Sequence, residues 1–350
     1  MLLQKPLDKT AELDCTQTIS ALSNAISCLG HDVVLIEADE DAYERLRASR
    51  VGLVFNIAEG IRGEDREAQI PAMLEMLGIP YTGSGPLTLA LCLNKARAKE
   101  ILSWHGIPTP AFQVWTHPHE SLSDTLVYPL IVKLLHEGSS MGLSYDSIVE
   151  TEQALKQQVR FLRETYGQPA LVEQFIEGRE FTVPVTGNSP PRALPAIEVL
   201  FQGPRPITLY QPDDAVIRML ARTQGKRVVA CENVKLSEDR RFALLETDTG
   251  TELEVPVTLS RSICPAKISR SLAEAVQSTA LKAYQALECR DWCRIDMRLG
   301  VDQVPQVLEL NPIAGIDASY WFPRSAKSAG MTYTELIGAI IDAARQRYHI

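Results

Sequence analysis

The first amphipathic helix that the sequence predicts lies between residues 16 and 29. Apolar side chains recur there at intervals of three and four residues, which places them on one face of a helix. These positions are Ile19, Leu22, Ala25, Ile26 and Leu29. Gly30 follows directly, and glycine commonly ends a helix. We therefore expect one helix that packs its apolar face against a core.

Two short apolar runs, at residues 32–36 and 51–56, have the length and composition of strands. Residues 41–49 between them have a helical pattern, and this alternation is typical of a parallel α/β lobe. Residues 1–13 are mostly polar after Leu3, so the strand that normally opens such a lobe is expected to be absent or short.

The end of this first lobe is marked by a loop. A helical pattern covers residues 67–77, and the next eight residues, Gly78-Ile-Pro-Tyr-Thr-Gly-Ser-Gly, contain one Pro and three Gly that interrupt regular structure. A second helical stretch follows at residues 87–105. The first predicted domain is therefore residues 1–92.

The remaining elements predict two further domains. A strand at residues 127–133 runs into a Gly/Ser loop that begins at Glu137, and a helix follows at residues 151–166. Further strands are predicted at residues 170–175, 181–186, 227–234 and 251–257. We expect a small central domain, residues 93–170, and an α+β C-terminal domain, residues 171–350.

Composition places the chain among globular proteins. Of its 350 residues 45% are hydrophobic and 23% are charged, and no apolar run reaches the roughly eighteen residues that span a bilayer. The formal net charge is −9, which disfavours a nucleic-acid partner because that binding relies on clustered Lys and Arg. We therefore expect no membrane and no nucleic acid as partners, and small-molecule substrates instead.

The cysteines and the first residues indicate a cytoplasmic protein. The seven cysteines form an odd set without a Cys-x-x-Cys pair, in a chain too large to need disulfides for its stability. Reduced thiols are the simpler interpretation. The start, Met1-Leu-Leu-Gln-Lys-Pro, lacks the basic, apolar and cleavage regions of a secretion signal.

The candidate chemistry concentrates in a predicted β-hairpin, with strands at residues 293–300 and 305–311. Alternate side chains share a face of a strand, so Arg294 and Asp296 point one way on the first strand, as do Glu309 and Asn311 on the second. Two carboxylates and an amide oxygen suit Mg²⁺, with Mn²⁺ as an alternative. The positive charge of Arg294 beside them is suited to stabilising an anionic reaction intermediate. The other interpretation is a half-exposed hairpin whose polar residues face solvent.

This hairpin, with Arg294-Ile-Asp followed by Glu309-Leu-Asn, resembles the metal-binding hairpin of ATP-grasp enzymes, specifically that of the D-alanine–D-alanine ligases. Other segments agree with that family in the same order along the chain. They are Gly63-Glu-Asp, Gln69, residues 74–85, Asn94-Lys95, Val132-Lys133, and residues 137–142, 172–174, 180–183, 264–266 and 329–331. The resemblance covers most of residues 53–336, except roughly residues 201–263. It implies an α/β chain with an ATP-grasp fold, in which a parallel α/β N-terminal lobe precedes two lobes that clasp ATP.

The resemblance implies phosphate contacts for Lys95 and Lys133, and a flexible cover over the phosphates for the loop Gly138-Ser139-Ser140. The residue types suit these roles. Small residues let backbone N–H groups approach anionic oxygens, and an ammonium group adds a point charge. A lysine at the end of a strand is also common at a solvated sheet edge, so this alternative stays open for Lys133.

By the same resemblance, five further residues bind the nucleotide. Glu173, Gln174 and Ile176 lie along the adenine, Glu180 holds the ribose hydroxyls, and Leu308 is a further nucleotide-binding residue. Ionised carboxylates only accept hydrogen bonds, which suits the hydroxyl and amino donors of a nucleoside.

The catalytic residues that the resemblance implies are Arg294, Gly315, Ser139 and Glu12. Arg294 and the backbone N–H of Gly315 stabilise the oxyanion of a tetrahedral intermediate. Ser139 helps to hold the first amino acid, and Glu12 meets its ammonium group. A charged residue just before a helix is often a cap or a dipole partner, so Glu12 has this structural alternative.

Two segments depart from the family. The family continues its hairpin asparagine as Asn-Thr-x-Pro-Gly, whereas here Asn311 is followed by Pro-Ile-Ala-Gly315. Tyr320 stands where the D-alanine enzymes have a serine that helps to bind the acceptor carboxylate, and Asp317 nearby would repel a carboxylate. The family's Tyr-x-x-Lys-Tyr loop is not found between residues 201 and 263, where Lys226 and Lys235 are candidate substitutes.

These features predict an ATP-dependent carboxylate–amine ligase that forms a dipeptide-like amide through an acyl phosphate. Its substrates are expected to be amino acids or peptides, and a homodimer is one expected assembly. Two alternatives remain, namely an ATP-grasp ligase with a different amine acceptor and a nucleotide-binding protein without ligase turnover. An NAD(P)-dependent dehydrogenase is disfavoured, since no Gly-x-Gly-x-x-Gly follows a strand.

Overall fold

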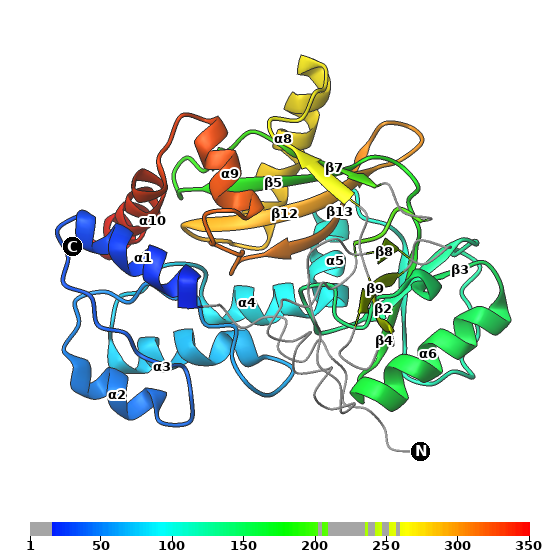
Figure 1. Ribbon diagram of the computed structural model, residues 1–350, viewed down its shortest axis with the longest axis horizontal. Coiled ribbons are helices and arrows are strands. Elements are labelled where there is room, and N and C mark those ends of the chain that lie inside the picture. The colour runs from blue at the N-terminus through cyan, green and yellow to red at the C-terminus, as the bar shows by residue number, and fades with distance from the viewer. Residues whose placement is uncertain (1–15, 202–204, 209–234, 237–241, 247–251, 257–259) are drawn as a thin grey trace. The chain divides into compact units, whose positions relative to one another are not determined.

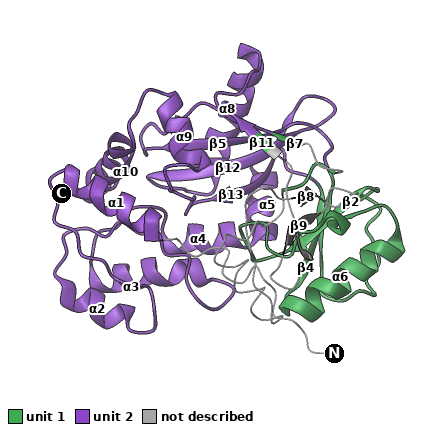
Figure 2. Ribbon diagram, in the orientation of Figure 1, with its two compact units in different colours: residues 1–13, 111–175, 200–261 green, residues 14–110, 176–199, 262–350 purple. Residues whose placement is uncertain are grey.

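The chain divides into two compact units, coloured separately in Figure 2. The computed structural model describes residues 16–201, 205–208, 235–236, 242–246, 252–256 and 260–350. Unit 1 comprises residues 1–13, 111–175 and 200–261, and unit 2 comprises residues 14–110, 176–199 and 262–350. The division into three domains at residues 92/93 and 170/171 stays a prediction.

The N-terminal part of unit 2 is helical (Figure 1). The helix predicted at residues 16–29 is confirmed as α1 (Thr16–Cys28), which packs Leu22 and Ala25 beside the C-terminal helix α10 (Tyr333–Tyr348). The helices predicted at residues 41–49 and 67–77 are also confirmed. They are α2 (Ala42–Ser49) and α3 (Gln69–Leu77), the latter preceded by the 3₁₀ turn Arg66–Ala68.

The two strands predicted at residues 32–36 and 51–56 do not form. Residues 31–38 lie outside regular structure, and in the second segment only Val54 makes a bridge, a parallel one to Tyr81. Val34 and Leu35 are 62% and 67% exposed. A strand is held by hydrogen bonds to a neighbour, and no described segment pairs with residues 32–36. The prediction of two strands is therefore wrong, although the bridge has the expected parallel direction.

Residues 86–104 form two helices where one was predicted over residues 87–105. α4 (Pro86–Leu93) begins at a proline and ends before Asn94, whose backbone is extended. The Asn94 side chain then caps α5 (Lys95–Trp104) by accepting a hydrogen bond from the backbone N–H of Arg97 at 3.2 Å. Asparagine is a strong N-cap residue, so it starts a new helix with Lys95 at the first position.

Unit 1 contains a four-stranded antiparallel sheet in the order β1-β4-β2-β3. Its strands are β1 (Phe112–Trp115), β2 (Leu130–Leu134), β3 (Ile148–Val149) and β4 (Ala170–Gln174). The 3₁₀ turn Tyr145–Ser147 precedes β3, and α6 (Glu152–Tyr166) packs Leu155 and Val159 against the sheet (Figure 1). The predicted strands at residues 127–133 and 170–175 and the helix at residues 151–166 are confirmed with small shifts of their ends.

A second, three-stranded antiparallel sheet of unit 1 has the order β10-β9-β8. Its strands are β8 (Lys235–Leu236), β9 (Phe242–Glu246) and β10 (Glu252–Pro256). β10 confirms the strand predicted at residues 251–257. The strand predicted at residues 227–234 lies outside the described residues.

The larger sheet carries the predicted hairpin. Its strands follow the order β11-β7-β5-β12-β13, and β6 pairs with β5. They are β5 (Glu180–Thr186), β6 (Arg192–Ala193), β7 (Ile197–Phe201), β11 (Ser260–Ile263), β12 (Trp292–Leu299) and β13 (Pro305–Asn311). α8 (Arg270–Ala286) buries Ala280 and Ala283 against one face of this sheet. Successive side chains of β12 point to opposite faces of the sheet, so its polar side chains lie on the face away from α8.

The mixed α/β class that the sequence predicts is confirmed by this arrangement. The short helix α9 (Trp321–Ser328) and α10 complete unit 2, where Phe322 and Ile337 share a core with Trp292. Among the described residues no helix is both long and apolar enough to cross a bilayer.

Candidate active site

The hairpin places four polar side chains on one face of the larger sheet. β12 and β13 pair antiparallel, with Arg294 opposite Asn311 and Asp296 opposite Glu309. Directly opposed residues in such a pair point to the same side. On the other side lie buried core residues, namely Ile295, Met297, Val307 and Leu310. Asp296 itself is only 8% exposed, whereas the other three side chains of the cluster are half-buried.

A β-bulge interrupts the hairpin beside this cluster. Asp296 pairs with Glu309 but Met297 pairs with Val307, so Leu308 is an extra residue without a partner of its own. Bulges next to active sites re-aim a side chain. Leu308 is half-buried like Glu309, whereas Val307 and Leu310 on either side of these two residues are buried in the core. The bulge therefore adds one apolar side chain to the polar face.

Asp296 is the centre of the cluster. Arg294 donates to both of its carboxylate oxygens, from Nε at 3.1 and 3.2 Å and from Nη2 at 2.9 Å, and Asn311 Nδ2 donates to Oδ2 at 3.2 Å. The Arg294 guanidinium also lies over the ring of Trp321, 5.5 Å from its centroid. Burial lowers the pKa of Arg294, but the charges of Asp296 and Glu309 raise it by more. Arg294 is therefore a fixed positive charge.

Glu309 pairs with a cation from another element of unit 2. Lys95 Nζ lies 3.6 Å from Glu309 Oε2, and the two side chains are 8% and 26% exposed. Lys95 is the first residue of α5, so the helix break at Asn94 is what places it there. A predicted phosphate contact and a predicted metal ligand thus lie side by side.

The donor set fits a divalent cation that keeps several waters. Asp296, Glu309 and Asn311 offer two carboxylates and one amide, while no group of three or more His, Cys, Asp and Glu in the described part of the chain forms a metal cage. Mg²⁺ commonly uses only one or two carboxylates together with substrate phosphates. Thr182 lies opposite Asp296 on β5, and its buried hydroxyl has no hydrogen-bond partner among the described residues. Such a buried group is expected to gain a partner when the site is filled.

Glu180, predicted to hold the ribose, is bound by an arginine to which the sequence assigned no role. Arg298 Nε donates to Glu180 Oε2 at 2.7 Å, and Arg298 Nη1 donates to the carbonyl oxygen of Ile176 at 2.9 Å. Burial raises the pKa of Glu180, and Arg298 counteracts this effect. Arg298 continues the alternation of Arg294 and Asp296, and this spacing is the signal that could have found it.

In unit 1, two residues with different predicted roles contact each other. Lys133 Nζ lies 3.0 Å from Glu173 Oε1, and the side chains are 11% and 2% exposed. β4 pairs with β2 along Lys133, whereas β3 pairs only with Leu130 and Ile131. It is therefore the low exposure of the side chain and the ion pair with Glu173, and not a strand on both sides, that distinguish Lys133 from a solvated lysine. A bound phosphate would share this cation with Glu173.

Gln174 uses its side-chain amide within unit 1. Its Nε2 donates to the carbonyl oxygen of Pro129 at 3.1 Å, and its Oε1 accepts from the backbone N–H of Val127 at 3.2 Å. These bonds fix the segment before β2. The adenine contact predicted for Gln174 stays a prediction.

The Gly/Ser loop has an unusual backbone. Ser139 and Ser140 both have positive φ, 47° and 58°, a region that residues with a side chain rarely adopt. The loop turns through backbone bonds from Met141 N to Gly138 O at 3.0 Å and from Leu143 N to Ser140 O at 3.2 Å. Backbone strain of this kind clusters at ligand-binding loops. The phosphate cover expected of this loop stays a prediction.

In the loop after the hairpin, the side chain of Tyr320 lies directly beside Gly315. A Cβ on Gly315 would lie 2.4 Å from Tyr320 Cδ2, so a larger residue there would require the exposed Tyr320 ring to move. Asp317 accepts hydrogen bonds from Ser319 N at 2.8 Å and Oγ at 2.5 Å, and from Thr18 Oγ1 at 3.3 Å. The bond with the Ser319 side chain is the main cause that lowers the pKa of Asp317. Asp317 is therefore an anion at neutral pH.

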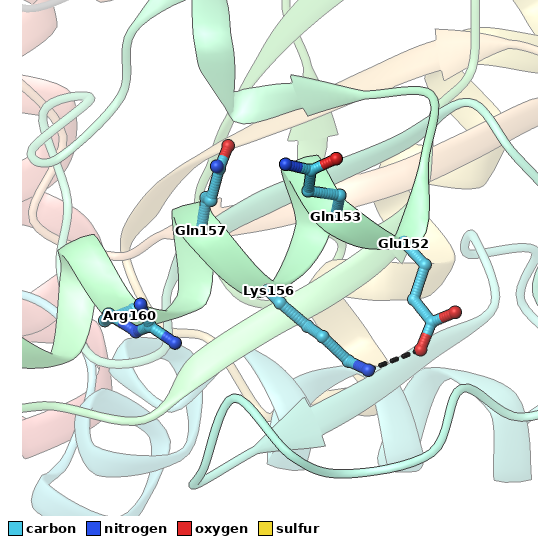
Figure 3. Close-up of a pocket in the computed structure, with 5 residues that line it drawn as sticks. All are labelled: Glu152, Gln153, Lys156, Gln157 and Arg160. Carbon is cyan, nitrogen blue, oxygen red and sulfur yellow. Dashed lines mark hydrogen bonds and ion pairs between the residues drawn. The ribbon is translucent and has the colours of Figure 1, made fainter.

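Some predicted residues lie outside this geometry. Glu12 and Lys226 fall outside the described residues, as does the side chain of Lys235. The hollow in Figure 3 contains none of the predicted site residues, because it is lined by residues of α6 alone. These residues are Glu152, Gln153, Lys156, Gln157 and Arg160. The bond from Lys156 to Glu152, four residues apart, is typical of a solvated helix face.

Known proteins resemble this chain over nearly its whole length. A family model described as the D-ala D-ala ligase C-terminus matches residues 101–223 and 251–342. An uncharacterized protein of Sinorhizobium fredii, y4sG, is 33% identical over 333 residues, which cover 93% of this chain and 86% of that protein. A D-alanine–D-alanine ligase of Bordetella petrii is 31% identical over 346 residues, which cover 97% of this chain and 91% of the ligase.

The fold agrees with these sequence relationships. The crystal structure of the D-alanine–D-alanine ligase from Bacillus anthracis superposes with a TM-score of 0.71 at 22% identity, covering 98% of this chain and 95% of that one. The family match spans more than half of the residues and includes both strands of the hairpin. The chain therefore belongs to the D-alanine–D-alanine ligase family and is an ADP-forming, ATP-dependent ligase of the ATP-grasp type.

Proposed function

We propose that this ligase converts the carboxylate of an amino acid into an acyl phosphate and joins it to an amine other than that of D-alanine. The observation that supports this proposal most is the hairpin face, where Arg294 is held by Asp296 and Trp321 beside Glu309 and Lys95. Fixed positive charge next to carboxylates suits a reaction in which anionic groups meet and charge moves onto an oxygen.

Eight residues bind the nucleotide in this proposal. Lys95 contacts the phosphates, as do Lys133 and the backbone of Ser140. Glu180 accepts hydrogen bonds from the ribose. The adenine is bound by Glu173, Gln174 and Ile176, and Leu308 is a further contact of the nucleotide.

Mg²⁺ is held by Asp296, Glu309 and Asn311 in the same proposal. When bound, it neutralises charge on the phosphate oxygens. Asn311 already donates to Asp296, and Lys95 pairs with Glu309, so both carboxylates are oriented before any ion arrives. Mn²⁺, which prefers similar oxygen ligands, is the alternative ion.

The oxyanion of the tetrahedral intermediate is stabilised by Arg294 and the backbone N–H of Gly315. Arg294 does not have to reorganise, because Asp296 and Trp321 hold its guanidinium. Ser139 and Glu12 contact the amino acid that provides the carboxylate. No protein nucleophile is needed, because ATP supplies the activating group.

The acceptor is where this chain differs from D-alanine enzymes. The ring of Tyr320 lies against Gly315, and the ionised Asp317 lies in the same loop. A carboxylate repels the carboxylate of an amino-acid acceptor and attracts an ammonium group. Asp317 is partly exposed, so solvent and salt limit this preference to about fivefold.

A phosphate-release screen tests the proposal. Purified protein with Mg-ATP is given amino acids singly and in pairs, followed by small amines, and the ligated products are identified by mass spectrometry. We expect phosphate release with a particular pair and little with D-alanine alone. The double variant Asp317→Thr with Tyr320→Ser is expected to improve the use of D-alanine relative to the native acceptor.

Two results would contradict the proposal. Strong synthesis of D-alanyl-D-alanine by the unaltered protein would show that the loop does not exclude this acceptor. Binding of ATP without phosphate release across the whole screen would instead support a nucleotide-binding protein without ligase turnover.

A further inference from the structure

Arg298 is a buried arginine with no assigned role in catalysis or binding. It lies on β12 two residues after Asp296 and is 5% exposed. Alternation along the strand places it on the polar face with Arg294 and Asp296. A buried arginine is rare unless it is paired, so its contacts indicate why it is there.

The contacts of Arg298 hold both ends of the turn formed by residues 176–180. Arg298 is directly opposite Glu180 in the pairing of β12 with β5. Its Nε and Nη2 both lie 2.7 Å from Glu180 Oε2, and its Nη1 donates to the carbonyl oxygen of Ile176 at 2.9 Å. Glu180 Oε1 is outside these contacts and remains a hydrogen-bond acceptor.

The backbone of this turn also lies in direct contact with the backbone at the end of β12. Leu299 N donates to Arg179 O at 2.9 Å, and a Cβ on Gly178 would lie 1.8 Å from the carbonyl oxygen of Leu299. The turn can approach β12 this closely because residue 178 is a glycine. The backbone is therefore already fixed, and Arg298 determines the orientation of the Glu180 carboxylate.

We propose that Arg298 is a positioning residue for the nucleotide, which orients Glu180 so that its free oxygen accepts a ribose hydroxyl. This inference rests on the ribose contact proposed above for Glu180. The planar guanidinium fixes one carboxylate oxygen and the Ile176 carbonyl together, which a lysine cannot do with the same geometry. The preference for a ribose over a deoxyribose nucleotide then depends on Arg298, although Arg298 does not touch the sugar.

The chain offers a matched control in the neighbouring residue. Arg179 donates to both carboxylate oxygens of Glu198, at 2.6 and 2.8 Å, and Glu198 is 5% exposed. Arg179→Met removes an arginine–carboxylate pair from the same turn without touching Glu180. Arg298→Met removes the pair that the inference concerns.

The experiment compares ATP with 2′-deoxy-ATP and 3′-deoxy-ATP by calorimetric titration in the presence of Mg²⁺, with circular dichroism to confirm folding. The proteins are the unaltered chain, Arg298→Met, Arg298→Lys, Arg179→Met and Glu180→Gln. We expect the unaltered protein and Arg179→Met to prefer ATP over at least one deoxy analogue by about tenfold, the size of one charge-assisted hydrogen bond. Arg298→Met and Glu180→Gln are expected to reduce that preference to about twofold or less, with Arg298→Lys in between.

The outcomes separate the inference from the function on which it rests. If Glu180→Gln loses the preference and Arg298→Met keeps it, Arg298 does not position Glu180 and the inference is wrong. If Glu180→Gln keeps the preference, the ribose contact of Glu180 is wrong, and the inference fails with it. If Arg298→Met does not fold, Arg298→Lys decides, because a full preference in that variant would also overturn the inference.

Discussion

Asp296 shows how single residues on the hairpin face share their partners. Its carboxylate accepts hydrogen bonds from both Arg294 and Asn311, and Glu309, opposite it on β13, forms an ion pair with Lys95. Removing one member therefore changes the surroundings of the others, and the effects of neighbouring substitutions are not expected to add. Two substitutions distinguish the proposed metal role from the proposed oxyanion role.

Glu309→Gln is expected to remove most Mg-dependent turnover, by about 10²-fold or more in kcat, because the amide cannot supply the charge of a metal ligand. Little change in folding is expected, since Glu309 is partly exposed and lies outside the apolar core. Phosphate release at varied Mg²⁺ measures the first effect, and thermal unfolding measures the second. Glu274→Gln on the exposed side of α8 is the control. Full activity in a folded Glu309→Gln protein would exclude the hairpin from the mechanism.

Arg294→Ala is expected to lower kcat by roughly 10²-fold while ATP affinity is retained, because the guanidinium stabilises charge that develops only during the reaction. Arg294→Lys keeps the charge but not the two-pronged contact with Asp296, so an intermediate loss is expected. Single-turnover phosphate release and nucleotide titration separate the two quantities. Loss of ATP binding with an unchanged kcat would assign Arg294 to the nucleotide instead.

At the scale of elements, short interruptions position the site. The break between α4 and α5 puts Lys95 beside Glu309, and the bulge at Leu308 adds an apolar side chain to the polar face. The turn at residues 176–180 depends on the close approach of Gly178 to Leu299. Each of these features is a local departure from a regular helix or strand.

Gly178→Ala is expected to destabilise unit 2 by about 1–3 kcal/mol, because its Cβ would overlap the carbonyl oxygen of Leu299 and force the turn away from β12. The free energy of unfolding from urea titration measures this loss. Gly52→Ala is the control, since a Cβ there meets no atom within 4 Å, and a change below about 1 kcal/mol is expected. Equal stability of the two variants would show that the turn relaxes without cost.

At the scale of the whole chain, Asp291 joins distant segments of unit 2. It is fully buried, accepts hydrogen bonds from Gly83 N and Asn188 Nδ2 at 2.8 and 2.7 Å, and pairs with Arg347 Nη2 at 2.8 Å. Arg347 in turn donates to the carbonyl oxygen of Tyr81 at 2.9 Å. One carboxylate thus connects the loop before α4, the loop after β5 and helix α10.

Asp291→Ala is expected to lower the free energy of unfolding by about 3–5 kcal/mol, because it leaves the half-buried Arg347 without its counter-charge. Urea titration followed by circular dichroism measures this loss. Asp342→Ala, which removes the exposed partner of Arg345, is expected to cost no more than about 1 kcal/mol. A double variant of Asp291 and Arg347 that is as stable as the unaltered chain would show that the pair itself contributes little.

Much of the local structure is determined by the sequence alone. The helices α1 and α6 and the hairpin of β12 and β13 follow from spacing, because a helix face or a strand face is set by residues close in the chain. The convergence of Arg294, Asp296, Glu309 and Asn311 follows in the same way, since a short turn fixes which residues oppose each other.

Only the tertiary structure decided the rest, because it depends on partners far apart in the chain. Residues 32–36 have the composition of a strand, yet no described segment supplies the hydrogen bonds that a strand needs. The pairing of Lys133 with Glu173 and the burial of Asp291 likewise join residues that no spacing rule connects. Arg298 lies between these cases: alternation predicts its face, but its hold on Glu180 exists only because β5 and β12 are neighbours in the folded sheet.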